Sequence, residues 1–102
     1  MSAPSSSIGS IVLDPLIHES ARLRIIAVLN ECENADFNFM LGTTALTRGN
    51  LSAHMAKLSA GGYVQEKKQF IGRIPHTEYQ LTKAGRLAYT KYLADWKRIT
   101  HP

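Results

Sequence analysis

The chain has 102 residues, of which 44% are hydrophobic, and a formal net charge of +4, as expected for one domain with a single small core. No apolar run approaches the roughly 20 residues of a membrane span, and the N-terminus lacks the charged-then-apolar pattern of a secretion signal. The single cysteine, Cys32, excludes an internal disulfide and has no partner at metal-site spacing. We therefore expect a cytoplasmic protein with no membrane partner.

The positive charge lies in the second half of the chain. Residues 1–46 contain two basic and five acidic residues, a net charge of −3, whereas residues 47–102 contain ten basic and three acidic residues, a net charge of +7. This asymmetry favours a polyanionic partner on one face. Many basic domains bind no nucleic acid, however, so net charge alone does not identify the partner.

The first elements are an arm and a buried helix. Residues 1–12 are rich in serine and should form a flexible arm. Asp14 then caps a short helical turn that runs from Pro15 through His18. Ser20 is the expected cap of a helix over residues 21–31, whose apolar residues spread around most of its circumference. Such a helix is buried by several neighbours, which puts it at the centre of the domain.

Two closely joined helices come next. The tripeptide Phe37-Asn38-Phe39 is either a very short strand or the entry to a helix. A short helix over residues 39–46, with Phe39, Met40 and Leu46 facing inward, then leads directly into a longer helix over residues 47–60. Two helices joined this tightly form a helix-turn-helix.

The longer helix has two unlike faces. Thr47 is a good N-cap and Gly61-Gly62 a strong stop, and Leu51, Met55 and Leu58 form one apolar stripe. The opposite line is small (Gly49, Ala53, Ala56 and Ala60), and hydrogen-bonding residues flank it (Arg48, Asn50, Ser52 and Lys57). Small outer residues beside polar ones suit a helix that enters a DNA groove. An alanine-rich surface helix is the alternative that this stretch leaves open.

Beyond Gly62 the apolar period changes from 3.6 to about 2, which predicts a β-hairpin over residues 63–81 with a turn at 71–75. Its base carries core-facing residues: Tyr63, Val64, Tyr79 and Leu81. Its tip carries basic residues: Lys67, Lys68, Arg73 and His76. The basic tip favours an anionic partner. The alternative is a solvated hairpin end whose lysines prevent the exposed strand edge from pairing with another chain.

The last predicted element is a helix over residues 83–98, capped by Thr82. Its aromatic and apolar face is broader than one small domain needs, and exposed faces of this kind usually mark a partner surface. We predict that Tyr89, Tyr92, Leu93 and Trp96 form the interface of a homodimer. The alternative is that the helix folds back and buries this face within the monomer.

The sequence has no pattern typical of a catalytic site. It contains neither a phosphate-binding glycine loop nor a paired-carboxylate or nucleophile–base arrangement. Its four histidines are scattered and lack metal-ligand spacing. His54, which lies beside the apolar stripe, is expected to be half-buried and hydrogen-bonded. We predict that the protein is not an enzyme and has no catalytic residue, metal site or cofactor.

Three segments resemble small winged-helix regulators related to the MarR and ArsR repressors: LIHESARLRIIAVL (16–29), LTRGNLSAHMAKLSAGGYV (46–64) and KKQFIGRIPHTEYQLTKAGRLAY (67–89). The likeness covers residues 13–98. It implies a mainly α fold with a small β-hairpin. It also implies a homodimeric transcriptional regulator that binds double-stranded DNA. Metal sensing is unsupported because Cys32 stands alone, and a small-molecule effector is unsupported because the chain lacks the extra helices of the larger members.

In such a protein helix 47–60 would read the major groove and hairpin 63–81 would be the wing. The predicted contacts from the helix are Thr47, Arg48, Gly49, Asn50, Ser52, Ala53 and Lys57, and those from the wing are Lys67, Lys68 and Arg73. Arginine pairs with guanine and asparagine with adenine. The wing cations would contact phosphates, or Arg73 would enter a narrow minor groove.

The predicted organisation is a flexible arm (1–12), a winged helix-turn-helix domain (13–82), and a dimerisation helix with a tail (83–102). A protein-interaction module and a non-specific architectural DNA binder are the alternative functions. RNA or single-stranded DNA is a less favoured partner, because no aromatic residue is expected on the exposed face of the helix or on the wing tip.

Overall fold

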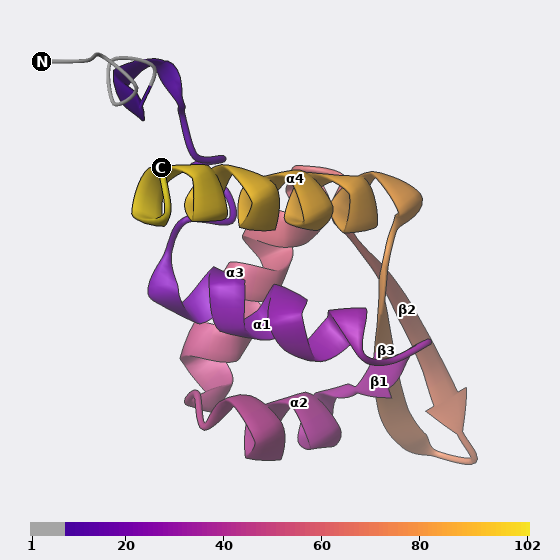
Figure 1. Ribbon diagram of the computed structural model, residues 1–102. Coiled ribbons are helices and arrows are strands. Elements are labelled where there is room, and N and C mark those ends of the chain that lie inside the picture. The colour runs from indigo at the N-terminus through magenta and orange to yellow at the C-terminus, as the bar shows by residue number, and fades with distance from the viewer. Residues whose placement is uncertain (1–7) are drawn as a thin grey trace, which may run out of the picture.

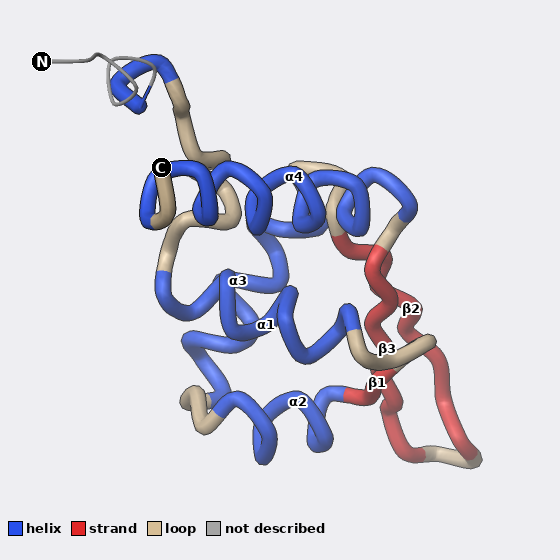
Figure 2. Tube along the Cα trace, in the orientation of Figure 1, coloured by secondary structure: helices blue, strands red, loops and turns tan. Residues whose placement is uncertain are grey.

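The computed structural model describes residues 8–102, which form four α-helices and a three-stranded antiparallel sheet. In chain order the elements are α1 (Ser20–Asn30), β1 (Ala35–Asp36), α2 (Phe37–Thr44), α3 (Arg48–Ala60), β2 (Val64–Ile71), β3 (Ile74–Leu81) and α4 (Lys83–Thr100) (Figure 1). The strand order is β1-β3-β2, so the sheet is a hairpin with one short strand added beside β3 (Figure 2). The predicted fold class, mainly α with a small β-hairpin, is confirmed.

The segment before α1 leaves the body of the molecule past α4 (Figure 1). Residues 1–7 of the predicted arm lie outside the described residues, and Val12 is 77% exposed. Leu13 packs against the core and Ile17 is fully buried within it. Asp14 accepts a hydrogen bond from the Leu16 amide at 2.9 Å, which supports the predicted turn after Pro15.

Helix α1 is the centre of the core, as predicted. Ile25, Ile26 and Leu29 are fully buried, and α1 contacts α2, α3, β3 and α4. Its cap is Glu19 rather than Ser20, because a Glu19 carboxylate oxygen accepts from the Arg22 amide at 2.8 Å while Ser20 is already helical. That hydrogen bond is the main reason why the pKa of Glu19 lies below its ordinary value.

Helix α2 starts and ends two residues before the predicted bounds. The Asp36 carboxylate caps it by accepting from the Phe39 amide at 2.8 Å. Ala45 ends it in the left-handed conformation, with φ of 59°. Met40 is buried as predicted, but Phe39 is 49% exposed, because the face of α2 that packs inward carries Met40 and Thr44. Of the two readings of residues 37–39, helix entry is correct.

Strands β2 and β3 pair from Val64 opposite Leu81 to Ile71 opposite Ile74. The turn is therefore only Gly72-Arg73, shorter than predicted. Gly72 has φ of 64°, as a two-residue hairpin turn with glycine at its first position requires. The base of the hairpin is buried as predicted, since Val64, Tyr79 and Leu81 are each 3% exposed. Strand β1, which the sequence did not predict, pairs with β3 through Ala35 and Tyr79.

Helix α4 begins at the predicted cap, because the Thr82 hydroxyl accepts from the Gly85 amide at 3.0 Å, and it continues to Thr100. Gly85 allows its first turn to press on the hairpin base, since a Cβ there would lie 2.3 Å from the Tyr63 carbonyl oxygen. Tyr92 is buried in the core. Over residues 8–102, none of the helices has the length and apolar character that crossing a bilayer requires.

Candidate nucleic-acid interface

Helix α3 has one face buried in the core and an opposite face exposed to solvent, which we call the bare face. Leu51, Met55 and Leu58 are at most 1% exposed and pack in the core. The Thr47 hydroxyl caps the helix by accepting from the Asn50 amide at 3.2 Å. The predicted cap and apolar stripe are both confirmed, so the opposite face of α3 is turned to solvent.

The bare face has a central line of small residues. Gly49, Ala53, Ala56 and Ala60 are all exposed. A Cβ added at Gly49 would meet no atom within 4 Å, so packing within the protein does not require a glycine there. The small side chains leave the backbone of α3 open to close approach by a partner.

Polar side chains stand on both sides of this line. As the helical periodicity of the sequence predicted, four polar residues are exposed: Arg48, Asn50, Ser52 and Lys57. Hydrogen-bond donors and acceptors beside a small-residue ridge are what the edges of base pairs require from a helix in the major groove.

Arg48 is held at the edge of the face by an aromatic ring. Its guanidinium carbon lies 5.5 Å from the centroid of Phe37 in α2, a cation–π contact. It also lines a polar cavity of about 270 Å³ between α2 and β3, together with Asn38 and Thr77. The sequence did not predict these three neighbours, because they meet Arg48 only through the tertiary fold.

A groove separates α3 from the hairpin. Ser52 and Ala56 of α3 line it on one side, and Lys68 and Thr77 of the hairpin line it on the other. Lys68 pairs across the sheet with Thr77, and Lys67 pairs with Glu78. Because successive strand residues point to opposite faces, Lys67 lies on the other face of the sheet, where it lines a hollow with Gln65 and Gln80. The structure therefore brings Lys68, but not Lys67, beside α3.

The one acidic residue in this groove is already bonded. Burial and the neighbouring Glu66 carboxylate raise the pKa of Tyr79 to about 12. The Lys68 ammonium also lies 3.6 Å from Glu66. The carboxylate is thus partly neutralised, which reduces its repulsion of an anion in the groove.

The helix-turn-helix is fixed from behind by α1. Arg22 donates to the Leu16 carbonyl at 2.7 Å and lies 3.2 Å from the His54 Nδ1 of α3. Arg24 donates to the Thr44 carbonyl, at the end of α2, at 2.9 Å. His54 is half-buried and hydrogen-bonded, as predicted. These contacts connect α1 to the end of α2 and to the middle of α3.

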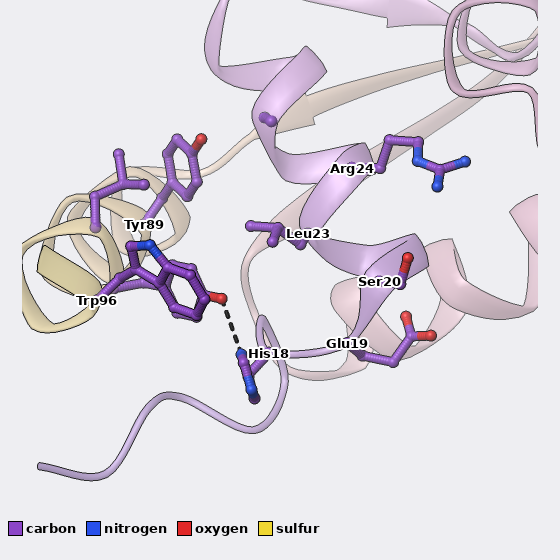
Figure 3. Close-up of a pocket in the computed structure, with 10 residues that line it drawn as sticks. His18, Glu19, Ser20, Leu23, Arg24, Tyr89 and Trp96 are labelled. Carbon is purple, nitrogen blue, oxygen red and sulfur yellow. Dashed lines mark hydrogen bonds between the residues drawn. The ribbon is translucent and has the colours of Figure 1, made fainter. Parts of the chain in front are cut away.

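A second surface lies between α4 and the start of α1. It is an apolar groove of about 720 Å³, lined by His18, Leu23, Tyr89, Leu93 and Trp96 among others (Figure 3). His18 Nδ1 lies 2.9 Å from the Tyr92 hydroxyl. Leu93 and Trp96 are 46% and 45% exposed, whereas Tyr92 is only 3% exposed. Of the predicted interface residues, Tyr92 therefore mainly fills the core, and the others border open apolar space.

Comparison with known proteins supports the DNA-binding interpretation. A sequence profile of the family described as winged helix DNA-binding domain matches residues 21–100. The uncharacterized protein MJ0432 of Methanocaldococcus jannaschii is 33% identical over 78 residues, which are 76% of this chain and 85% of that protein.

Solved structures of regulators share the fold. The transcriptional regulator homologue protein from Pyrococcus horikoshii OT3 matches with a TM-score of 0.80 at 24% identity, over 97% of this chain and 95% of that one. A MarR family transcriptional regulator from Silicibacter pomeroyi matches with a TM-score of 0.63 at 19% identity, over 96% of this chain and 64% of that one.

The predicted resemblance to winged-helix regulators is thereby confirmed. The family profile indicates a DNA-binding domain, and the solved structures show that the fold is shared. The helix-turn-helix of α2 and α3, the hairpin of β2 and β3, and the profile over residues 21–100 agree. The chain belongs to the winged helix DNA-binding domain family.

Proposed function

We propose that the protein is a sequence-specific regulator of transcription that binds double-stranded DNA as a homodimer. The observation that carries the proposal is the bare face of α3, where exposed small residues lie between exposed polar ones. In this arrangement α3 lies in the major groove, and the β2–β3 hairpin is the wing that lies along the neighbouring backbone.

Each polar group has a role within this proposal. Asn50 and Arg48 read base edges, because their side chains match adenine and guanine bidentately. Gly49 and Ala53 allow close approach, and Ser52 and Lys57 add hydrogen bonds. Thr47, whose hydroxyl caps α3, contributes at the helix end. On the wing, Lys68 is the main phosphate contact beside α3, Arg73 lies further out in the turn, and Lys67 lies on the other face of the sheet.

The homodimer is proposed from the apolar groove beside α4. Leu93 and Trp96, two large apolar side chains, are exposed along this groove, and neighbouring exposed apolar side chains of this kind are typical of a protein–protein interface. A second copy related by a two-fold axis would cover Leu93 and Trp96 and place two α3 helices about one helical turn, roughly 34 Å, apart. Residues 13–82 are then the DNA-binding unit and 83–102 the dimerisation helix and tail.

Replacement of Asn50 tests base reading by α3. Asn50→Ala removes an exposed side chain and should leave folding intact, since the cap uses its backbone amide. We expect a loss of about 1–3 kcal/mol in binding energy at one base position of the preferred site, measured by competition with single-base variants. An unchanged preference at every position would remove Asn50 from the reading set.

A further inference from the structure

The tip of the wing is apolar on both faces. Phe70, Ile71 and Ile74 are 71%, 59% and 70% exposed. Phe70 lies opposite Pro75, and Ile71 opposite Ile74. Because paired residues share a face and successive residues alternate, one apolar pair lies on each side of the sheet. The sequence-based expectation that the wing tip carries no aromatic residue is therefore wrong, because Phe70 is exposed there.

These side chains are not part of the folding core. None of them belongs to the buried cluster or packs against it. The strand rise places them about 20 Å from the buried pair Val64 and Leu81. Cross-strand pairing next to the turn would be served as well by threonine, which is also β-branched. Their exposure therefore requires an explanation outside the monomer.

The chemistry of the tip suits a narrow anionic slot. Arg73 is the only ionisable residue from Gln69 to Pro75, and it lies in the exposed turn. A flat surface would cover one apolar pair and leave the other in water. The minor groove of DNA has sugar walls on both sides and opens when the duplex kinks toward the major groove, so that it can cover both apolar pairs.

We infer that residues 70–75 act as an apolar wedge that enters the minor groove and opens a base step, so that the bound duplex bends. Inserted phenylalanine, isoleucine and proline side chains unstack base pairs in this way and kink the duplex toward the major groove. Pyrimidine–purine steps open most easily, so the wedge adds a sequence preference beside the bases that α3 reads. This inference rests on the proposed function, because it requires binding to duplex DNA.

The test compares the bend induced by the full-length protein and by a variant with threonine at the three exposed positions. The probe is a duplex enriched from a random pool by the wild-type protein, with fluorophores at both ends and 2-aminopurine at the steps under the wing. Wild type should bend the duplex by roughly 20–90° and raise the 2-aminopurine emission. Phe70→Thr/Ile71→Thr/Ile74→Thr should bind the same duplex more weakly and leave it straight.

Leu87→Thr is the matched control, because Leu87 is also an exposed apolar residue, 63% accessible, but lies on α4; it should bend DNA like wild type. A wild-type complex with a straight duplex would overturn the wedge while leaving the proposed function intact. Tighter binding to the single strand than to the duplex, dependent on Phe70, would also overturn it in favour of base stacking. Absence of any duplex binding would refute the proposed function itself.

Discussion

At the residue scale, the position of each cation decides what it can do. Arg22 and Arg24, the two basic residues of the acidic half, are hydrogen-bonded to backbone carbonyls behind the helix-turn-helix. Arg48, Lys57, Lys68 and Arg73 remain exposed on α3 and the hairpin. The surface left for an anion is therefore more basic than the net charge of +4 suggests.

The two wing lysines form a natural test pair. Lys68 faces the groove beside α3, whereas Lys67 lies on the opposite face of the sheet near Glu78. Lys68→Ala should weaken binding to all duplexes and lower the slope of log affinity against log salt by about one. Lys67→Ala, the matched control, should change the slope less. Titrations at four salt concentrations measure both, and equal slope changes would argue against the one-sided docking of the wing.

Tyr63 links the hairpin base to the segment before α1 by donating a hydrogen bond to the Asp14 carboxylate. That bond is the first cause that raises the pKa of Tyr63 from 10 to about 12. A raised pKa means that the stabilisation is complete below pH 10 and is lost as the pH rises toward 12.

Tyr63→Phe should lower the free energy of unfolding by about 1–3 kcal/mol at pH 8. The difference from wild type should shrink between pH 10 and 12, because wild type loses the bond there and the variant has none to lose. Urea unfolding at several pH values measures it. In Asp14→Asn the free energy of unfolding should depend less on pH between pH 10 and 12. A difference between wild type and Tyr63→Phe that stays constant up to pH 12 would contradict this role of the pair.

At the scale of elements, α3 is fixed on one side and unobstructed on the other. Its cap, the contact between Arg22 and His54, and three buried side chains hold it on the core. Nothing within 4 Å restrains a side chain added at Gly49. Changes on the outer line therefore separate folding from binding.

Gly49→Ala should leave the free protein as stable as wild type or more stable by up to about 1 kcal/mol, since alanine is the better helix former. It should nevertheless weaken DNA binding, because the added methyl group stands between α3 and the groove floor. Gly42→Ala in α2 is the matched control, with equally open surroundings. Thermal unfolding measures the stability of each variant, and duplex titration measures its affinity for DNA. Unweakened binding by Gly49→Ala would place the groove contact elsewhere on α3.

Local signals in the sequence were enough for some elements and not for others. Thr47 and Thr82 were predicted as caps because each lies directly before a helix with a clear pattern. Glu19 and Asp36 were missed as caps, since the sequence does not show which side-chain oxygen reaches the free amides. Strand β1 has only two residues and no periodicity, and it exists because β3 pairs with it.

The candidate site shows the same division. The buried and exposed faces of α3 follow from helical periodicity alone. The opposite positions of Lys67 and Lys68 follow from strand alternation, once the hairpin register is fixed by its two-residue turn. The contact of Arg48 with Phe37 requires the packing of α2 against α3, which no local pattern specifies.

At the scale of the whole molecule, the proposed function requires two copies of the chain. The groove between α4 and α1 leaves Leu93 and Trp96 about half exposed. Leu93→Asp should convert the dimer to monomers, because a buried interface tolerates an unpaired carboxylate poorly. Leu87→Asp, on the other side of α4, is the control and should stay dimeric. Sedimentation equilibrium measures the mass of each, and a monomeric wild type would contradict the dimer.

The central claim is that two α3 helices read a duplex together. The most direct measurement is selection of duplexes from a random pool by the purified protein, after titration of the same pool across a salt series. We expect salt-sensitive binding and an enriched, two-fold symmetric motif whose half-sites are about one helical turn apart. Salt-sensitive binding without an enriched motif, or no binding at low salt, would contradict it.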